Sequence, residues 1–246
     1  MIFNLFKKKY EPRPIFGPLG TDMHCHLIPK VDDGSKCIEE TIECLQTLKA
    51  VGYNKVIITP HFQTPRFEND EDDIRRRYAE VKQQAADAGV EIELAGIGGE
   101  YRIDSGFQRR VDNPRFLKVG NKYVLVEFSL HQQMMGTDEM IFDLQMKGYE
   151  IILAHPERYP YLNVEGDRIE RLKEQGVFFQ VNVLSLGGFY GPDAKRKAFA
   201  MLDRGWVEFL GTDTHNTLYA QALTDLSHDR KVEKLLEKQE FLNKTL

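Results

Sequence analysis

The sequence predicts an α/β fold in which about seven parallel strands alternate with helices and close into a barrel. Two observations lead to this expectation. Short apolar segments rich in Val, Ile and Phe alternate with amphipathic helical segments over residues 21–246. Most of the apolar segments also run directly into a histidine or a carboxylate, and the carboxyl ends of parallel strands meet on one face of a barrel.

Seven segments are predicted to be strands covered on both faces, because they are short and largely apolar. They are Thr21–Cys25, Lys55–Thr59, Glu91–Gly98, Tyr123–Phe128, Glu150–Ala154, Phe178–Val183 and Val207–Gly211. An open, doubly wound sheet is the alternative, but it would spread the strand ends along a line instead of bringing them together.

Helices are predicted between these strands from apolar spacing and capping residues. Ser35 can cap a helix that ends at Gly52, and Asn69 or Asp70 can cap a helix that ends at Gly89. Four further helices are expected at Asp138–Lys147, Gly166–Gln175, Pro192–Arg204 and Asp225–Lys238.

The bulk composition excludes several classes of protein. The formal net charge is −5, whereas nucleic-acid-binding domains usually carry a basic patch, so no nucleic-acid partner is expected. The three cysteines have no paired metal spacing, which favours free thiols in a reducing compartment, the cytoplasm. No apolar run approaches the roughly 18 residues of a membrane-spanning helix.

Residues 1–20 are expected to form an N-terminal arm outside a single domain of residues 21–246. Met1–Phe6 is apolar and Lys7–Lys9 is basic, an order opposite to that of a secretory signal peptide. Two interpretations stay open: a loosely held arm closed off by prolines, or a segment that touches an anionic membrane surface.

The predicted strand ends carry many side chains that can bind metal ions. They are His24, His26, His61, Glu100, Glu127, His155, Asp213 and His215. Alternate strand residues point to the same side, so His24 and His26 aim together and Cys25 points away. One such histidine alone is commonly a capping residue, and a lone glutamate can pair with an arginine, but the convergence of all of them predicts a metal site. Imidazole and carboxylate without thiolate suit Mn²⁺, Fe²⁺, Zn²⁺ or Co²⁺, and Asp22 and Asp32 could hold ligands in position.

At these residues the chain resembles the PHP (polymerase and histidinol phosphatase) superfamily, and within it the metal-dependent protein-tyrosine phosphatases of bacterial capsule and exopolysaccharide operons. The matching segments follow the family's order over roughly residues 21–216: DMHCHLIPKVDDG, ITPHF, GGEY, LVEFS, LAHPERY, VNVLSLGG and GTDTHN. The resemblance implies a distorted seven-stranded β/α barrel, the PHP fold, that holds three divalent ions, with Mn²⁺ the expected one.

The resemblance also implies how the ligands are shared among the three ions, with Glu100 bridging two of them. The three sets are His24, His26, Glu100 and Asp213; Glu100, Glu127 and His155; and Asp33, His61 and His215. Arg158 matches an arginine that the family uses on the substrate phosphate, and the alternative for it is an ion pair with Glu127 or Glu157.

The sequence departs from the family pattern after GTDTHN. Members from Gram-positive bacteria usually carry another basic residue a few positions later, and here Thr217, Leu218 and Tyr219 follow. A second arginine on the phosphate is therefore in question at that position. Lys30, Arg66 and Arg102 are the candidates to replace it.

The implied reaction is hydrolysis of phosphotyrosine in proteins by attack of a metal-bound hydroxide. Arg158 would offset phosphoryl charge, and Asp213 or His215 could deliver a proton to the leaving group through water. The implied partner is the tyrosine-rich tail of a bacterial tyrosine autokinase that controls polysaccharide export at the inner membrane. Oligomerisation stays open.

Aromatic residues are predicted around such a site. The glycine-rich loop Ser185–Gly191 could flank a tyrosine ring together with Phe62, Phe67 and Tyr101, although plain loop packing is an equal alternative. His131 is interpreted as a loop or rim residue.

Five other functions are considered. A histidinol-phosphate phosphatase or a PHP phosphoesterase acting on nucleotides would keep the fold, and a non-catalytic metal-binding scaffold would keep the ligands. An amidohydrolase would need a lysine at a middle strand end, and none is found. A cysteine-dependent tyrosine phosphatase would need arginine where Val31 stands in H-C-x5-R, so Cys25 is interpreted as a packing residue.

Overall fold

The structure is a computed structural model and describes residues 10–132 and 134–246. The segments Met1–Phe6 and Lys7–Lys9, with their two interpretations, lie outside the described residues. Within the described part of the chain, none of the helices combines the length and the apolar character needed to cross a membrane.

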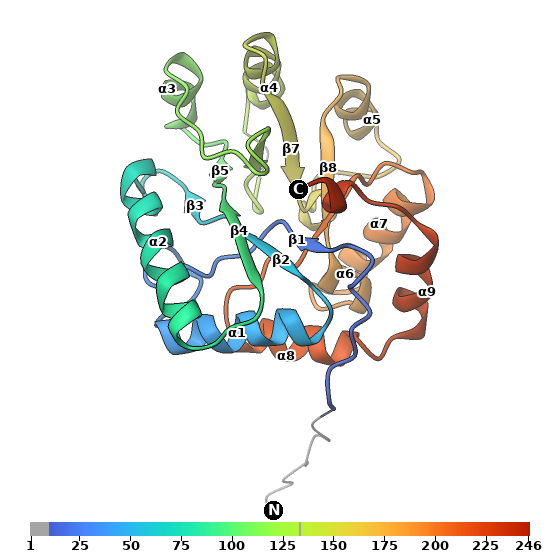
Figure 1. Cartoon of the computed structure of the whole chain (residues 1–246). Helices are drawn as coiled ribbons and strands as arrows, with labels where there is room; N and C mark the ends of the chain where they lie inside the picture. The colour runs from blue at the N-terminus through green and yellow to red at the C-terminus, as the bar shows by residue number, and fades with distance from the viewer. Residues whose placement is uncertain (1–9, 133) are drawn as a thin grey trace, which may run out of the picture.

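Parallel strands arranged as a distorted barrel form the centre of the molecule (Figure 1). A three-stranded sheet and a six-stranded sheet share this barrel. In order, they contain β1 (Thr21–Asp22), β2 (Lys55–Ile58) and β4 (Glu93–Ile97); and β3 (His61–Phe62), β5 (Glu100–Arg102), β6 (Tyr123–Glu127), β7 (Glu150–Ala154), β8 (Phe178–Asn182) and β9 (Phe209–Gly211). Every pair of neighbouring strands is parallel, so the predicted fold class is confirmed.

Two short strands that were not predicted, β3 and β5, follow the predicted strands Lys55–Thr59 and Glu91–Gly98 and belong to the second sheet. β3 continues the direction of β2 after Pro60, which has no N–H to donate to a ladder. β5 continues β4 after Gly98 and Gly99. A Cβ atom at Gly98 would lie only 2.8 Å from Cγ2 of Val119, so glycine is required for this close approach.

The barrel closes between its first and last strands, just beyond their regular ends. Cys25 forms a parallel bridge with Thr214. The Asp213 N–H donates to the His24 carbonyl oxygen at 2.8 Å, and the His26 N–H donates to the Thr214 carbonyl oxygen at 2.8 Å. The closure confirms that the first and last strands are neighbours, and it brings two histidines beside an aspartate that is distant in sequence.

Helices surround the strands (Figure 1). They are α1 (Ile38–Ala50), α2 (Glu71–Asp87), α3 (Phe107–Asp112), α4 (Thr137–Met146), α5 (Asp167–Glu174), α6 (Val183–Gly187), α7 (Pro192–Asp203), α8 (Thr217–Leu226) and α9 (Arg230–Lys238). Asp70 caps α2, as predicted, because its side chain accepts from the N–H groups of Asp72 and Asp73.

Several helix predictions need correction. Ser35 does not cap α1: the N-cap residue is Cys37, and the Ser35 hydroxyl is instead within 2.7 Å of the Thr41 hydroxyl. The predicted helix Asp225–Lys238 is two helices, α8 and α9, which a turn separates. The predicted loop Ser185–Gly191 begins inside α6.

The packed part of the chain begins before the predicted boundary at residue 21. Ile15, Phe16 and Leu19 are buried in the main hydrophobic core. The Phe16 ring stacks on Tyr53 with centroids 5.4 Å apart and an interplanar angle of 5°. Part of the predicted arm therefore belongs to the globular core.

Alternation along the strands decides what lies inside the barrel. On β6, Val124 and Val126 belong to the main core, whereas Tyr123 and Leu125 belong to a separate apolar cluster that also contains Phe209. The next residue in the second series is Glu127, at the strand's carboxyl end. The inward-facing residues of β6 are therefore apolar along the strand and become a carboxylate at its carboxyl end, where the site is predicted.

Candidate metal centre

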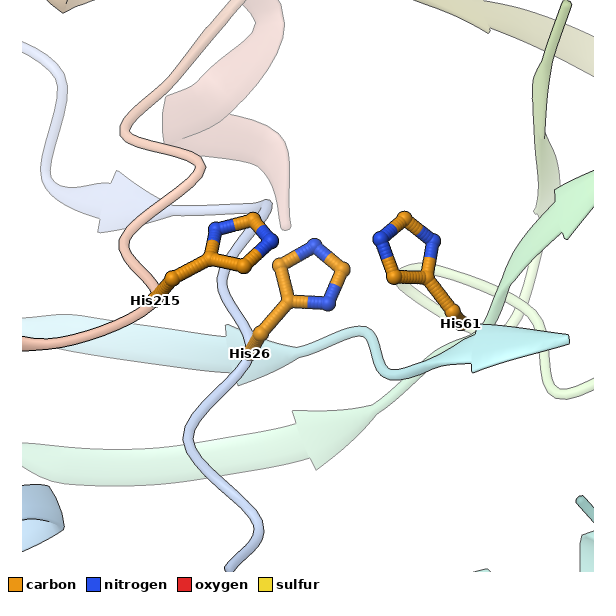
Figure 2. Close-up of side chains that lie close together, drawn as sticks. All are labelled: His26, His61 and His215. Atoms are coloured by element: carbon orange, nitrogen blue, oxygen red, sulfur yellow. The ribbon is translucent and has the colours of Figure 1, made fainter. Parts of the chain in front are cut away.

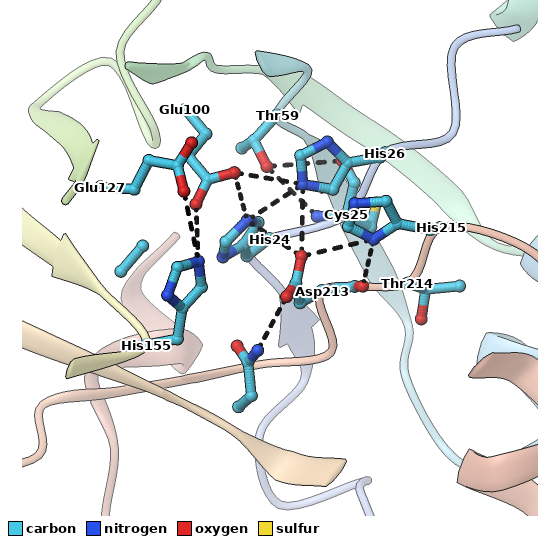
Figure 3. A network of polar contacts seen from close by, with 12 residues as sticks. His24, Cys25, His26, Thr59, Glu100, Glu127, His155, Asp213, Thr214 and His215 are labelled. Atoms are coloured by element: carbon cyan, nitrogen blue, oxygen red, sulfur yellow. Dashed lines mark hydrogen bonds and ion pairs between the residues drawn. The ribbon is translucent and has the colours of Figure 1, made fainter. Parts of the chain in front are cut away.

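The predicted strand-end residues meet at the carboxyl ends of the barrel strands. Figure 2 shows three imidazole rings from different segments lying close together, and the ring centroid of His26 is 4.3 Å from that of His61 and 4.1 Å from that of His215. Figure 3 shows the carboxylates of Glu100, Glu127 and Asp213 among the rings of His24, His26, His155 and His215. The predicted convergence of histidines and carboxylates is therefore observed.

The first donor set contains two imidazole nitrogens and two carboxylate oxygens. Nε2 of His24 and Nε2 of His26 are 3.2 Å apart, and each lies 3.3 Å from Oε2 of Glu100. Oδ1 of Asp213 lies 3.5 Å from the His24 nitrogen and 3.3 Å from the His26 nitrogen. All four side chains are buried.

Glu100 connects this first set to a second. Its Oε2 atom faces the first set, and its Oε1 atom lies 2.9 Å from Nε2 of His155. That imidazole nitrogen is 3.9 Å from Oε2 of Glu127. One carboxylate therefore presents an oxygen to each of two neighbouring donor sets, which is the arrangement of a bridging ligand.

A third set lies nearer the surface. Oδ1 of Asp33 is 3.4 Å from Nε2 of His61 and 3.7 Å from Nε2 of His215. The Asp33 side chain is 40% exposed, unlike the buried carboxylates of the other sets. His61 also directs its Nδ1 atom to Oε2 of Glu100 at 3.0 Å, so this ring lies between the third set and the other two.

The donor atoms of the first set fit a metal ion. Nε2 of His24, Nε2 of His26 and Oδ1 of Asp213 lie 3.2–3.5 Å from one another, and the centre of such a triangle lies about 2 Å from each corner, the length of a zinc–nitrogen or zinc–oxygen bond. Oε2 of Glu100 and Nδ1 of His61 are buried and, although they lie 3.0 Å apart, neither makes a hydrogen bond among the described residues. Unpaired buried polar atoms are costly, and an ion would satisfy them.

Oxygen acceptors behind the rings fix the tautomers of three histidines. The Nδ1 atoms of His24, His26 and His215 lie 2.7 Å from Oε1 of Gln180, 2.9 Å from Oδ2 of Asp32 and 2.8 Å from the carbonyl oxygen of Asp213. Each Nδ1–H therefore donates outward, and each Nε2 lone pair faces the donor sets. The predicted supporting role of Asp32 is thus observed in its contact with His26.

Two other residues that position the metal-binding side chains were not predicted from the sequence. Gln180 and Asn182 alternate on β8 and point to the site, and the Asn182 amide donates to Oδ2 of Asp213 at 2.8 Å. Their position at an inward-facing strand end was a usable signal, although amides are not themselves typical metal ligands. Asp22 contacts Thr212 and the His24 N–H, so it supports the barrel closure and does not contact an imidazole ring.

Charges in the cluster shift pKa values in both directions. Burial opposes ionisation of Glu100 and Asp213, yet the neighbouring imidazoles hold the pKa of both carboxyls well below the usual range. Burial also opposes charge on His61, yet Glu100 outweighs it and raises the pKa of His61 to about 10. Burial and the nearby His26 lower the pKa of His215 to about 4. The carboxylates are therefore ionised at neutral pH, as metal ligands must be.

Two site residues adopt left-handed backbone conformations. The φ angles of His155 and Asp213 are 36° and 54°. Such angles are uncommon outside glycine and cost of order 1–3 kcal/mol, and they cluster at functional sites. The chain thus turns sharply at the ends of β7 and β9 to direct these side chains into the barrel.

A pocket of about 300 Å³ lies over the donor sets, and arginines line it. Nη1 of Arg158 donates to Oδ2 of Asp213 at 2.7 Å, and the Arg158 guanidinium lies 4.2 Å from the centroid of the Tyr190 ring. The alternative pairings of Arg158 with Glu127 or Glu157 are not observed among the described residues. Arg66 and Arg102 also line the pocket.

The predicted aromatic rim needs correction. Phe62 and Tyr101 are buried and stack on each other with centroids 4.5 Å apart, so both belong to the core. Phe67 instead stacks on the His61 ring with an interplanar angle of 6°. Tyr219, which the sequence analysis did not place at the rim, lines the pocket, and so does the predicted rim residue His131.

Comparison with known proteins identifies the family. The family described as capsular polysaccharide synthesis, CpsB/CapC, matches residues 20–237. The chain belongs to this family. CapC from Staphylococcus aureus is 28% identical to it over 221 residues, which are 89% of this chain and 86% of that protein. The tyrosine-protein phosphatase YwqE from Bacillus subtilis is 26% identical over 196 residues, 79% of this chain and 77% of YwqE.

A solved structure shows the same fold. It is one of the crystal structures of YwqE from Bacillus subtilis and CpsB from Streptococcus pneumoniae, which are metal-dependent tyrosine phosphatases. The two folds superpose with a TM-score of 0.76 at 23% sequence identity, over 90% of this CpsB/CapC chain and 96% of the solved one. This likeness confirms the predicted barrel.

Proposed function

We propose that this CpsB/CapC protein is a metal-dependent phosphatase that hydrolyses phosphotyrosine in proteins. The observation that carries the proposal is the gathering of imidazole and carboxylate donors beneath a pocket that arginines line. Tyrosine-protein phosphatases among its relatives favour phosphotyrosine over histidinol phosphate or a nucleotide as the substrate.

Three divalent cations are proposed to bind the three donor sets defined above, with Mn²⁺ the expected ion and Fe²⁺, Zn²⁺ or Co²⁺ the alternatives. Bound cations would lower the pKa of water so that a nucleophile exists at neutral pH, and they would offset charge on the phosphoryl oxygens. The mixture of nitrogen and oxygen donors without sulfur supports ions of this type.

Arg158 is proposed to hold the substrate phosphate. Its contacts with Asp213 and with the face of Tyr190 fix the guanidinium before substrate arrives, so little side-chain entropy is lost on binding. Asp213 and His215 are proposed to pass a proton through water to the leaving oxygen. That demand is modest, because a phenol with a pKa near 10 leaves readily.

The proposed partner is the tyrosine-rich tail of a bacterial tyrosine autokinase that controls capsule or exopolysaccharide synthesis, and the proposed compartment is the cytoplasm. The free thiols of Cys25, Cys37 and Cys44 fit a reducing environment. Contact of the N-terminal segment with the inner membrane and oligomerisation remain part of this proposal.

The test is a phosphatase assay on metal-loaded protein. We expect hydrolysis of a phosphotyrosine peptide in Mn²⁺, loss of activity after chelation and recovery when Mn²⁺ returns. Histidinol phosphate and a nucleotide serve as competing substrates in the same assay, and faster turnover of either would replace phosphotyrosine as the substrate. A His24→Ala/His26→Ala variant that keeps full activity would contradict the metal assignment.

Cys25→Ser is the matched control for the thiolate mechanism. Cys25 is buried, its Sγ atom faces the carbonyl oxygen of Ile57 at 3.8 Å, and burial raises the pKa of its thiol well above the usual value. The variant should therefore stay active. A correctly folded but inactive Cys25→Ser protein would indicate cysteine-dependent chemistry.

A further inference from the structure

The pocket over the donor sets holds more than one cation that could contact a phosphate. Arg66, Arg102 and Arg158 line it, whereas Lys30 lines a different surface pocket beside Arg77. The structure therefore removes Lys30 from the candidates for a second phosphate-binding residue. The two remaining candidates differ strongly in how the fold holds them.

We propose that Arg102 is a second residue that contacts the substrate phosphate, together with Arg158. The inference rests on the proposed phosphatase function. Arg102 ends β5, and its register partner on β6 is Glu127. The Nε–H of Arg102 donates to Oε1 of Glu127 at 2.9 Å. Among residues 10–132 and 134–246 this bond uses only one of the five N–H donors of the guanidinium, so the terminal nitrogens can bind an anion.

Arg102 and Arg158 have similar environments in the pocket. Each donates to one buried carboxylate of the cluster, Glu127 for Arg102 and Asp213 for Arg158, at 2.9 and 2.7 Å. These carboxylates belong to different donor sets. The side chains of Arg102 and Arg158 are 16% and 18% exposed, so both arginines are partly desolvated. A charge-assisted hydrogen bond is strongest in such an environment.

Arg66 is held much less firmly. Its side chain is 61% exposed, and its contacts are a 3.3 Å ion pair with Asp33 and the face of Phe67. Exposed ion pairs contribute little, and ordering a solvated arginine on a phosphate costs side-chain entropy. A phosphomonoester carries close to two negative charges on its terminal oxygens. Two preorganised guanidinium groups match that charge better than one fixed and one mobile group.

The experiment measures binding of inorganic phosphate to Mn²⁺-loaded protein by titration calorimetry, with metal content determined on the same samples. We expect Arg102→Gln to weaken phosphate binding about 10- to 100-fold at wild-type metal content, since a hydrogen bond between charged groups is lost. Arg102→Lys keeps the positive charge but not the planar guanidinium with its two terminal nitrogens, so it should lose less phosphate affinity than Arg102→Gln. Lys30→Gln, outside the pocket, is the matched control and should bind like wild type.

Three outcomes would overturn the proposal. Unchanged phosphate affinity in Arg102→Gln would remove the contact. A large loss in Arg66→Gln without one in Arg102→Gln would assign the role to Arg66. An Arg102→Gln protein that cannot be loaded to wild-type metal content would make Arg102 a positioning residue for Glu127. Because phosphate binding is read without turnover, failure of wild type to hydrolyse phosphotyrosine would be recorded separately, as a failure of the proposed function.

Discussion

The two ends of the barrel interior use the same strands but differ in chemistry. At the amino end, Tyr123, Leu125, Ile152 and Phe209 form a buried apolar cluster. At the carboxyl end, the same strands or their extensions supply carboxylates and imidazoles, with Glu127 two residues beyond Leu125. The apolar end can only stabilise the fold, whereas the polar end buries ionised groups that reduce stability unless they are paired.

Residues that stabilise the fold and residues that can bind metal ions are therefore separated along one axis of the barrel. Inward-facing positions on β8 change from Phe178 to Gln180 and Asn182 over five residues. Packing at one end can therefore hold the strand ends in place while the other end carries repulsion between like charges. Substitutions at the two ends should affect different measurements.

The largest effect is expected at the bridging carboxylate. Glu100→Gln removes a charge that faces both buried donor sets, so we expect metal content to fall and phosphatase activity to drop at least about 10³-fold, as for removal of one member of a catalytic unit. Elemental analysis and a phosphopeptide assay on one sample check this. A variant with wild-type metal content and activity would contradict the bridging role.

Leu125→Ala should lower stability and leave metal content and activity nearly unchanged. Leu125 is fully buried in the apolar cluster, so its truncation should lower the free energy of unfolding by about 2–5 kcal/mol, as in other buried cores. Urea unfolding measures this, and activity per folded molecule at 25 °C should stay near wild type. Leu218→Ala, 65% exposed, is the control and should change stability by less than about 0.5 kcal/mol. Loss of metal binding in folded Leu125→Ala would show that the two ends are coupled.

Gln180→Ala tests the boundary between the two ends. Its Oε1 atom accepts from Nδ1 of His24, so loss of this contact should free the ring and lower metal affinity about 10- to 100-fold. Competition with a chelator of known affinity measures the change. Gln180→Glu keeps the acceptor and should recover part of the affinity, whereas an equal loss in both variants would argue against a role in holding the tautomer.

The smallest effect is expected at Tyr190, whose ring contacts the Arg158 guanidinium. Tyr190→Ala removes the ring beneath the guanidinium, a contact worth about 0.5–2 kcal/mol, so KM should rise roughly 2- to 30-fold with little change in kcat. Tyr190→Phe keeps the ring and loses the long hydroxyl contacts with Asp213 at 3.3 Å and with the Asn182 amide at 3.4 Å, so its KM should change little. A fall in kcat with constant KM in Tyr190→Ala would place the residue in the chemical step instead.

The sequence predicted the barrel and the convergence of its strand ends, because both depend on simple alternation. Period two explains why His24 and His26 share a side, and the end of each apolar segment marked the carboxyl face. Asp33 was different: it lies in a loop and emerged only from the resemblance to a known family. Alternation gives no information on residues outside the strands.

The failures have physical reasons. The short strands β3 and β5 were not predicted, because they pair only after the breaks at Pro60 and at Gly98, and the second break depends on the close approach of Gly98 to Val119. Phe62 was predicted at the rim, yet it is adjacent to His61 on β3 and adjacent strand residues point to opposite faces, so it enters the core. Arg158 pairs with Asp213, a partner that only the tertiary structure brings near.

The closure of the barrel has a consequence for the timing of synthesis. His24 and Asp213 meet through hydrogen bonds between the first strand and the segment after β9, so the first donor set needs both ends of the barrel at once. A nascent chain still lacking the last strand cannot assemble this set. Catalytic competence should therefore arise late in translation, after nearly the whole domain has left the ribosome.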